Sequence, residues 1–153
     1  MKIAIAGTGY VGLVTGVCLA EMGHDVVCVD IDEKKVRRME SGESPIFEPG
    51  LDELMAKNRE RLAFTTDYKN AYRNAEVVFI GVGTPEKKDG SANLKYVYEV
   101  AGQIAESVER DCLVVIKSTV PVGTNDRIEK LLKDRVKAGL HIEVASNPEF
   151  LAQ

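Results

Sequence analysis

The sequence predicts an α/β fold, a doubly wound, mostly parallel sheet of about six strands with helices on both faces. Two observations predict it. Short apolar runs alternate along the chain with longer amphipathic segments, as strands alternate with crossover helices in parallel sheets. The runs Val77-Val78-Phe79-Ile80 and Leu113-Val114-Val115-Ile116 are continuously apolar, which indicates strands buried on both faces.

The first half of the chain contains three such strands and four helices. Apolar runs predict strands at residues 2–6, 25–30 and 62–65, the last of them weak. Amphipathic or charged segments predict helices at residues 10–22, 33–40, 51–57 and 67–73, and Asp67 stands near the N-cap of the fourth. A loop rich in glycine, proline and serine occupies residues 41–50.

The second half repeats the alternation with longer helices. Strands are predicted at residues 76–81, 112–117 and 141–145, and a long loop follows the first of them to about residue 92. Residues 94–108 carry apolar side chains at helical spacing, and residues 123–137 form the last predicted helix. Pro121 is expected to start that helix near its first position, where proline is tolerated.

The composition is typical of a globular domain and argues against a nucleic-acid-binding or membrane-spanning protein. The 153 residues are 44% hydrophobic and 29% charged, enough for one domain with a sizeable core, which we expect to span residues 1–153. A net charge of -4 lacks the basic footprint of a nucleic-acid binder. No apolar run approaches the roughly 20 residues that span a bilayer, and glycines interrupt the N-terminal apolar run. We therefore expect a soluble, cytoplasmic protein without nucleic-acid or membrane partners.

Three cysteines, Cys18, Cys28 and Cys112, are widely spaced and embedded in apolar stretches. An odd number at such spacing indicates neither a disulfide framework nor a metal site. Each is expected to be a small buried hydrophobic residue in a reducing compartment.

The glycine-rich segment after the first strand is the most informative motif. Gly7, Gly9 and Gly12 form a G-x-G-x-x-G pattern between a predicted strand and a predicted helix. Gly7 can supply a tight turn, Gly9 a close backbone approach to a pyrophosphate, and Gly12 close packing of helix on strand. The pattern predicts a Rossmann-type dinucleotide site with the anion at the helix N-terminus.

Asp30 ends the second predicted strand, eighteen residues after Gly12. A carboxylate there can accept hydrogen bonds from the adenosine ribose, and it would repel a 2′-phosphate, so NAD is favoured over NADP. Lys35, one helical turn further on, partly offsets that repulsion. The alternatives are a tight turn followed by a capping aspartate, and a FAD site, for which the sequence offers no flavin pocket.

Two later strands also end in small and polar residues, where ligands bind in such sheets. Gly83 and Thr84 follow the strand at residues 76–81, and Thr119 follows the strand at residues 112–117. Glu149 follows the last strand and can place a carboxylate in the same crevice. Each also has a structural explanation, Thr119 as a helix cap and Glu149 as a surface acid, and the residues alone do not decide between them.

Taken together, five motifs make the chain similar to a known family. They are Gly7-Thr8-Gly9-Tyr10-Val11-Gly12-Leu13, Pro45-Ile46-Phe47-Glu48-Pro49-Gly50-Leu51, Val82-Gly83-Thr84-Pro85, Lys117-Ser118-Thr119-Val120-Pro121-Val122-Gly123-Thr124 and Ser146-Asn147-Pro148-Glu149-Phe150-Leu151. In this order and spacing they resemble the UDP-glucose/GDP-mannose dehydrogenase family over the whole chain, and the fourth is most similar to the members that oxidise UDP-glucose.

The resemblance implies an NAD-dependent, four-electron oxidation of a nucleotide-sugar C6 alcohol, giving UDP-glucuronate from UDP-glucose with two NAD. It implies that Thr119 and Glu149 are catalytic and order a water molecule. The implied cofactor residues are Gly7, Gly9, Tyr10, Val11, Gly12, Asp30, Lys35, Gly83, Thr84, Thr119 and Gln153. The implied substrate residues are Glu149, Phe150, Leu151, Ala152 and Gln153. The loop from Pro45 to Leu51 is expected near the sugar.

The chain departs from the family in two ways. Gln153 stands where a glutamate is common, and an amide cannot act as a base. The family's linking helix, through which members usually form homodimers, and its second domain, which supplies a cysteine nucleophile, would follow Gln153. None of Cys18, Cys28 and Cys112 matches that nucleophile's motif. We therefore expect the 153-residue chain alone to bind NAD without turnover.

Two alternatives stay open. The domain can belong to a dehydrogenase of GDP-mannose or of a UDP-N-acetylhexosamine, because the base and sugar are selected largely outside this chain. It can also be a stand-alone NAD-binding module without catalytic activity.

Overall fold

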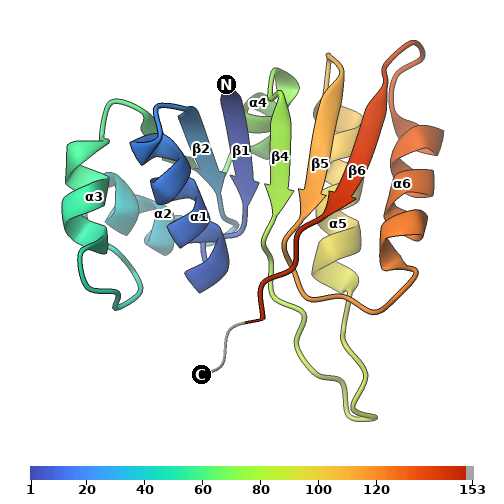
Figure 1. Cartoon of the computed structure of the whole chain (residues 1–153), viewed down its shortest axis with the longest axis horizontal. Helices are drawn as coiled ribbons and strands as arrows, with labels where there is room; N and C mark the ends of the chain where they lie inside the picture. Colours follow the sequence, from blue (N-terminus) through green and yellow to red (C-terminus); the bar gives the residue numbers. More distant parts are fainter. Residues whose placement is uncertain (151–153) are drawn as a thin grey trace.

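The computed structural model describes residues 1–150 and contains one six-stranded sheet (Figure 1). Its strands are β1 (Lys2–Ala6), β2 (Asp25–Val29), β3 (Leu62–Thr65), β4 (Val77–Ile80), β5 (Cys112–Ile116) and β6 (Ile142–Ser146). The order across the sheet is β3-β2-β1-β4-β5-β6, and all neighbours pair in parallel. This is the doubly wound order of dinucleotide-binding sheets, so the predicted fold class is confirmed.

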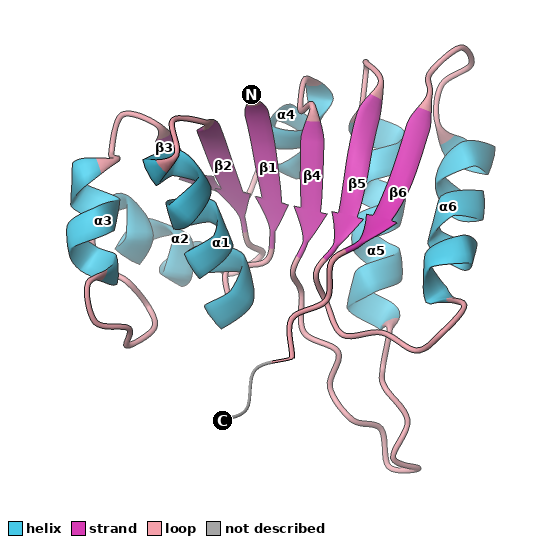
Figure 2. Ribbon diagram, in the orientation of Figure 1, coloured by secondary structure: helices cyan, strands magenta, loops and turns pink. Residues whose placement is uncertain are grey.

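Within residues 1–150, six helices cover the two faces of this sheet. They are α1 (Tyr10–Glu21), α2 (Glu33–Glu40), α3 (Leu51–Lys57), α4 (Tyr68–Arg73), α5 (Lys95–Ser107) and α6 (Thr124–Arg135). Figure 2 shows α1 and α3 on the near side of the sheet and α4 and α5 behind it. Because successive side chains of a strand point to opposite faces, the four inner strands β2, β1, β4 and β5 each contribute to both cores.

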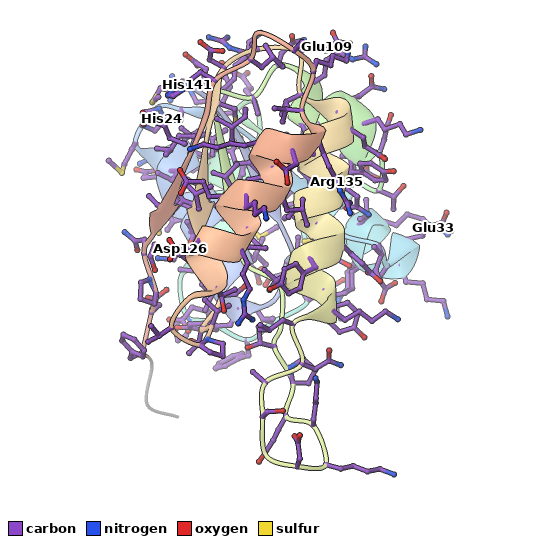
Figure 3. The ribbon with its side chains drawn as sticks, turned by 90° about the vertical axis from the view of Figure 1, so that its right-hand side faces the viewer. His24, Glu33, Glu109, Asp126, Arg135 and His141 are labelled. Atoms are coloured by element: carbon purple, nitrogen blue, oxygen red, sulfur yellow. The ribbon has the colours of Figure 1, made fainter. Side chains whose placement is uncertain are left out.

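The two cores divide the strand residues between them. Ile3 and Ile5 of β1 pack with residues of α1, α2 and α3 in one core. Ala4 and Ala6 of the same strand pack with residues of α4, α5 and α6 in the other. Figure 3 shows α5 and α6 side by side on this second face. The sheet is therefore a rigid platform whose carboxyl ends all lie at one edge, the lower edge in Figure 1.

The predicted elements agree closely with the structure. Every predicted strand and helix is present, and the largest shift is at α6, predicted to end at residue 137 and observed to end at Arg135. Asp67 is the N-cap of α4, as predicted, and accepts a hydrogen bond from the Asn70 N–H at 3.2 Å. No helix within residues 1–150 is long and apolar enough to cross a membrane.

Two details of the sequence prediction are wrong. Pro121 does not start α6, because Gly123 is the N-cap and Thr124 the first helical residue. The carbonyl of Pro121 instead accepts a hydrogen bond from the Thr124 N–H at 3.2 Å, within the turn that precedes the helix. Cys18 is exposed, whereas Cys28 and Cys112 are buried. The buried face of α1 runs through Val17, and the next residue along a helix turns away from that face.

Three glycines let α1 approach the ends of β1 and β4 closely. A Cβ atom at Gly12 would lie 2.0 Å from the carbonyl oxygen of Gly7. A Cβ atom at Gly7, whose φ is +97°, would lie 2.8 Å from the carbonyl oxygen of Gly81. Both obstacles are backbone atoms, which cannot move aside. The geometry thus supports the predicted packing role of Gly12. Gly81, which is not part of the glycine motif, packs against Gly7 in the same contact.

We predict that Gly12→Ala destabilises the fold by at least about 2 kcal/mol, because an added methyl group must displace backbone in a close-packed site. The free energy of unfolding is measured by urea denaturation. Gly9→Ala is the matched control, since its added Cβ would meet no heavy atom of the described residues within 4 Å. Equal stability of the two variants would contradict the proposed packing.

Candidate cofactor cleft

The N-terminus of α1 presents unpaired backbone amides at the carboxyl edge of the sheet. Gly9 is the N-cap, and no side chain of the described residues caps this helix. The first backbone hydrogen bond into the helix runs from the Leu13 N–H to the Gly9 carbonyl at 3.0 Å. The amides before Leu13 are therefore left for a ligand, and with the helix dipole they favour an anion. The space beside Gly9, and that beside Gly83, is open.

A cleft of about 280 Å³ lies in front of these amides. Its lining combines the glycine loop, the end of β2, the loop after β4 and one face of α5. The lining residues are Ala6, Gly7, Thr8, Gly9, Val29, Asp30, Ile31, Lys35, Tyr72, Gly81, Val82, Gly83, Tyr96, Glu99, Val100 and Gln103. The cleft thus offers free amides, the carboxylates of Asp30 and Glu99 and a largely apolar wall, which suits a diphosphate joined to a nucleoside.

Asp30 is held on both of its carboxylate oxygens. Its Oδ2 accepts hydrogen bonds from the Thr8 N–H at 3.1 Å and from the Thr8 hydroxyl at 2.5 Å. Its Oδ1 accepts a hydrogen bond from the Asp32 N–H at 2.9 Å. The Lys35 ammonium lies 3.6 Å from Oδ2. The side chain is only 12% exposed, so its orientation is fixed by these partners.

The same partners keep Asp30 ionised. Burial by itself raises the pKa of a carboxyl group, because it removes water from the charged form. Here the hydrogen bonds from Thr8 and Asp32, together with the charge of Lys35, outweigh burial, and the pKa of Asp30 lies below its ordinary value of 3.8. The cleft therefore contains a fixed negative charge beside the amides of α1.

The loops after β4 and β5 are joined to each other by side-chain hydrogen bonds. The Ser118 hydroxyl donates to the Val82 carbonyl at 2.6 Å, and the Thr84 hydroxyl donates to the Thr119 carbonyl at 3.0 Å. Thr84 and Thr119 are thus neighbours, as their places after adjacent strands predict. Neither of them lines the cleft in front of α1.

A second polar cluster lies at the ends of β5 and β6. The Lys117 ammonium donates to the Asn147 side-chain carbonyl at 3.0 Å and lies 3.7 Å from a carboxylate oxygen of Glu149. Its side chain is 13% exposed. The Tyr10 hydroxyl donates to Glu48 at 3.0 Å, and Glu48 raises the pKa of Tyr10, with a smaller contribution from Glu149. The start of α1 and the loop before α3 thus lie near Glu149.

Besides Thr84, Thr119 and Glu149, which are described above, the predicted site residues fall into three groups. Gly7, Gly9, Asp30, Lys35 and Gly83 line one cleft. Tyr10, Val11 and Gly12 form the first turn of α1 behind its unpaired amides without lining the cleft. Phe150 is exposed, and Leu151, Ala152 and Gln153 lie outside the described residues.

Sequence reasoning missed several residues of the site. Thr8 lies between two glycines of the motif, and its hydroxyl, a hydrogen-bond donor, is the one feature of the sequence that could have indicated a role. Lys117 opens one of the family motifs, but no pattern in the sequence predicts its contacts with Asn147 and Glu149. Tyr96, Glu99 and Gln103 are spaced as one face of α5, beside its apolar stripe, but only the tertiary structure shows that this face borders the cleft.

A larger cavity, about 550 Å³, lies elsewhere, between β2, β3 and α4. It shares no lining residue with the glycine loop and presents no free helix N-terminus, so volume alone does not identify the ligand site. Among residues 1–150, no group of three or more histidine, cysteine or acidic residues could hold a metal ion.

Comparisons with known proteins agree with this geometry. Residues 1–153 match the family described as UDP-glucose/GDP-mannose dehydrogenase family, NAD binding domain. UDP-glucose 6-dehydrogenase YwqF of Bacillus subtilis is 55% identical over 155 residues, which cover 100% of this chain and 35% of that protein. The chain therefore spans about a third of the length of such curated relatives.

Solved structures of nucleotide-sugar dehydrogenases are also similar to this chain. A GDP-mannose dehydrogenase of Pseudomonas aeruginosa has a TM-score of 0.90 at 42% identity, covering 100% of this chain and 37% of that one. A UDP-D-ManNAc dehydrogenase of Pyrococcus horikoshii has a TM-score of 0.91 at 32% identity, covering 99% of this chain and 37% of that one.

We predict that Asp30→Asn lowers the free energy of unfolding by about 1–3 kcal/mol at pH 7, because hydrogen bonds to a charged group are lost. The pKa of Asp30 is depressed in the folded state, so its contribution is present above the unfolded-state pKa. It is lost as the pH falls through the folded-state pKa, below 3.8.

Urea denaturation at pH 7, 5 and 3 tests this prediction, and the difference between the two proteins should shrink at the lowest pH. The control Asp134→Asn removes an exposed carboxylate of α6 and should change stability by less than about 0.5 kcal/mol. A difference for Asp30→Asn that is constant with pH would contradict the account.

Proposed function

Because this chain belongs to the UDP-glucose/GDP-mannose dehydrogenase family, as its NAD-binding domain, we propose that it serves an enzyme that oxidises UDP-glucose to UDP-glucuronate. The observation that carries this proposal is the 55% identity to a UDP-glucose 6-dehydrogenase across the whole chain, together with the cleft built on the glycine loop and Asp30. Oxidising a primary alcohol to a carboxylate removes four electrons and consumes one water molecule, so two NAD are required for each sugar.

We assign the following roles to the cleft residues. The amides at the start of α1 bind the cofactor's diphosphate, with Gly9 leaving room for its approach. Asp30 accepts a hydrogen bond from the adenosine ribose, and the α5 face with Tyr96 borders the adenosine. When bound, NAD supplies a two-electron oxidant at the far end of the cleft, and the linked loops of Thr84 and Thr119 border its nicotinamide side.

The substrate side is assigned to the cluster at the ends of β5 and β6. Thr119 and Glu149 order the water molecule used in proton transfer and hydrolysis, and the segment from Glu149 to Gln153 contacts the nucleotide sugar. Lys117 acts as a positioning residue, since its ammonium, on a side chain that is 13% exposed, contacts both Asn147 and Glu149. The Tyr10–Glu48 contact holds the loop before α3 near Glu149.

One alternative substrate has specific support. The solved GDP-mannose dehydrogenase is 42% identical to this chain with a TM-score of 0.90, so a GDP-mannose enzyme remains the second candidate. The two substrates share the oxidised C6 alcohol and differ in base and sugar. Relative turnover of the two nucleotide sugars distinguishes the candidates.

The proposal is tested in a chimaera in which this chain replaces the matching third of the B. subtilis relative. We expect UDP-glucose-dependent NADH formation, two NADH for each UDP-glucose consumed, with GDP-mannose much slower. The 153-residue chain assayed alone supplies the background rate. A chimaera that is folded and binds NADH, yet forms no NADH with UDP-glucose, would contradict the proposal.

In the same chimaera we predict that Glu149→Gln lowers kcat by about a hundredfold, the size usual for losing a positioned proton-transfer group. NADH binding should be unchanged, because Glu149 does not line the cleft in front of α1. Glu143→Gln is the matched control, an exposed glutamate on β6 that we place outside the site. Equal kcat values for the two variants would exclude the role of Glu149.

A further inference from the structure

Thr8 is buried although it lies in the loop that forms the cofactor cleft. Its exposed fraction is 0%, and it stands between Gly7 and Gly9. Both of its donors, the backbone N–H and the side-chain hydroxyl, are directed to one atom, Oδ2 of Asp30. This places a fixed link between the end of β1 and the end of β2, in the wall of the cleft.

The hydrogen bonds from Thr8 limit how many acceptor sites the Asp30 carboxylate can offer to a ligand. A carboxylate oxygen has about two lone pairs. On Oδ2 both are taken by Thr8, and the Lys35 ammonium lies 3.6 Å away. On Oδ1 one is taken by the Asp32 N–H at 2.9 Å. Asp30 therefore retains a single acceptor site, on Oδ1.

We propose that Thr8 is a specificity-determining residue for the cofactor, because it commits Oδ2 of Asp30 and thereby presents Oδ1 as the one acceptor for a 2′-hydroxyl group. A ribose hydroxyl can donate to that oxygen. A 2′-phosphate has no comparable proton to donate at neutral pH and carries a like charge, so it is rejected. The inference rests on NAD binding in the cleft and is independent of which nucleotide sugar is oxidised.

Lys35 explains why the hydroxyl of Thr8 matters for selection. Lys35, whose side chain is 35% exposed, is the cationic residue in the described lining of the cleft, and its ammonium can attract a 2′-phosphate. While Asp30 is held in place by Thr8, the charge of Lys35 is paired with it. Without the hydroxyl, Asp30 loses its shortest hydrogen bond, and both it and Lys35 gain freedom to move. Binding of the 2′-hydroxyl form then weakens, while rejection of the phosphate form relaxes.

The test compares NADH and NADPH binding to the 153-residue chain by fluorescence titration. Thr8→Val keeps the side-chain shape and removes the hydroxyl, so the Kd for NADH should rise about tenfold, the size of one lost hydrogen bond to a charged group. The Kd for NADPH should rise far less or fall, and so the preference for NADH should fall at least about fivefold. Thr8→Ser, which restores the hydroxyl, should return the preference to within about twofold of the starting protein.

Thr15→Val is the matched control, a threonine of α1 that does not line the cleft, and it should leave both Kd values unchanged. Thr8→Ala gives the same comparison if valine prevents folding. An unchanged NADH preference in the folded Thr8 variants, or an equal loss of both cofactors, overturns the proposal. Failure of the unmodified chain to bind either cofactor is a different result, because it rejects the NAD site itself.

Discussion

The close approach of α1 to the ends of β1 and β4 is the constraint on which the site depends. Only hydrogen atoms on Gly7 and Gly12 permit it, since a Cβ at Gly12 would lie 2.0 Å from a backbone oxygen. The approach brings the first, unpaired amides of α1 to the carboxyl edge of the sheet. Backbone amides alone thus form an anion-binding surface, and no charged side chain is needed for it.

Among the described residues, Asp30, Lys35 and Glu99 bring charge to the cleft, and Asp30 is the one bonded to the glycine loop. Asp30 is largely buried, which by itself would favour its neutral form, yet hydrogen bonds from Thr8 and Asp32 and the nearby Lys35 keep it ionised. A buried carboxylate with fixed partners discriminates between ligands better than a mobile surface group, because it cannot turn away from an unfavourable one. At the other end of the carboxyl edge, the Lys117 ammonium lies 3.7 Å from Glu149, whose side chain is 39% exposed.

The strands, the helices and the glycine motif could be predicted from the sequence because each depends on residues that are close together along the chain. The strands and helices follow from periodicity, and the glycine motif lies within one strand–turn–helix unit, so Gly7, Gly9 and Gly12 could be assigned directly. Asp30 was found because the motif fixes how far along the chain the next strand ends. The Thr8 link and the α5 wall depend on which elements become neighbours, which no local pattern encodes. Pro121 was predicted to start α6 because proline is common at that position, but it lies in the turn before the helix. Cys18 was predicted to be buried because its neighbours are apolar, but it lies on the exposed side of α1.

The central claim is that the unpaired amides at the start of α1 receive the cofactor's diphosphate. Backbone amide chemical shifts of the ¹⁵N-labelled chain, followed by NMR as NAD is added, test it most directly. The account predicts the largest saturable changes at Gly9, Tyr10, Val11 and Gly12, with accompanying changes at Thr8 and Asp30. Changes confined to the larger cavity beside β2, β3 and α4, or none at millimolar NAD, would contradict it.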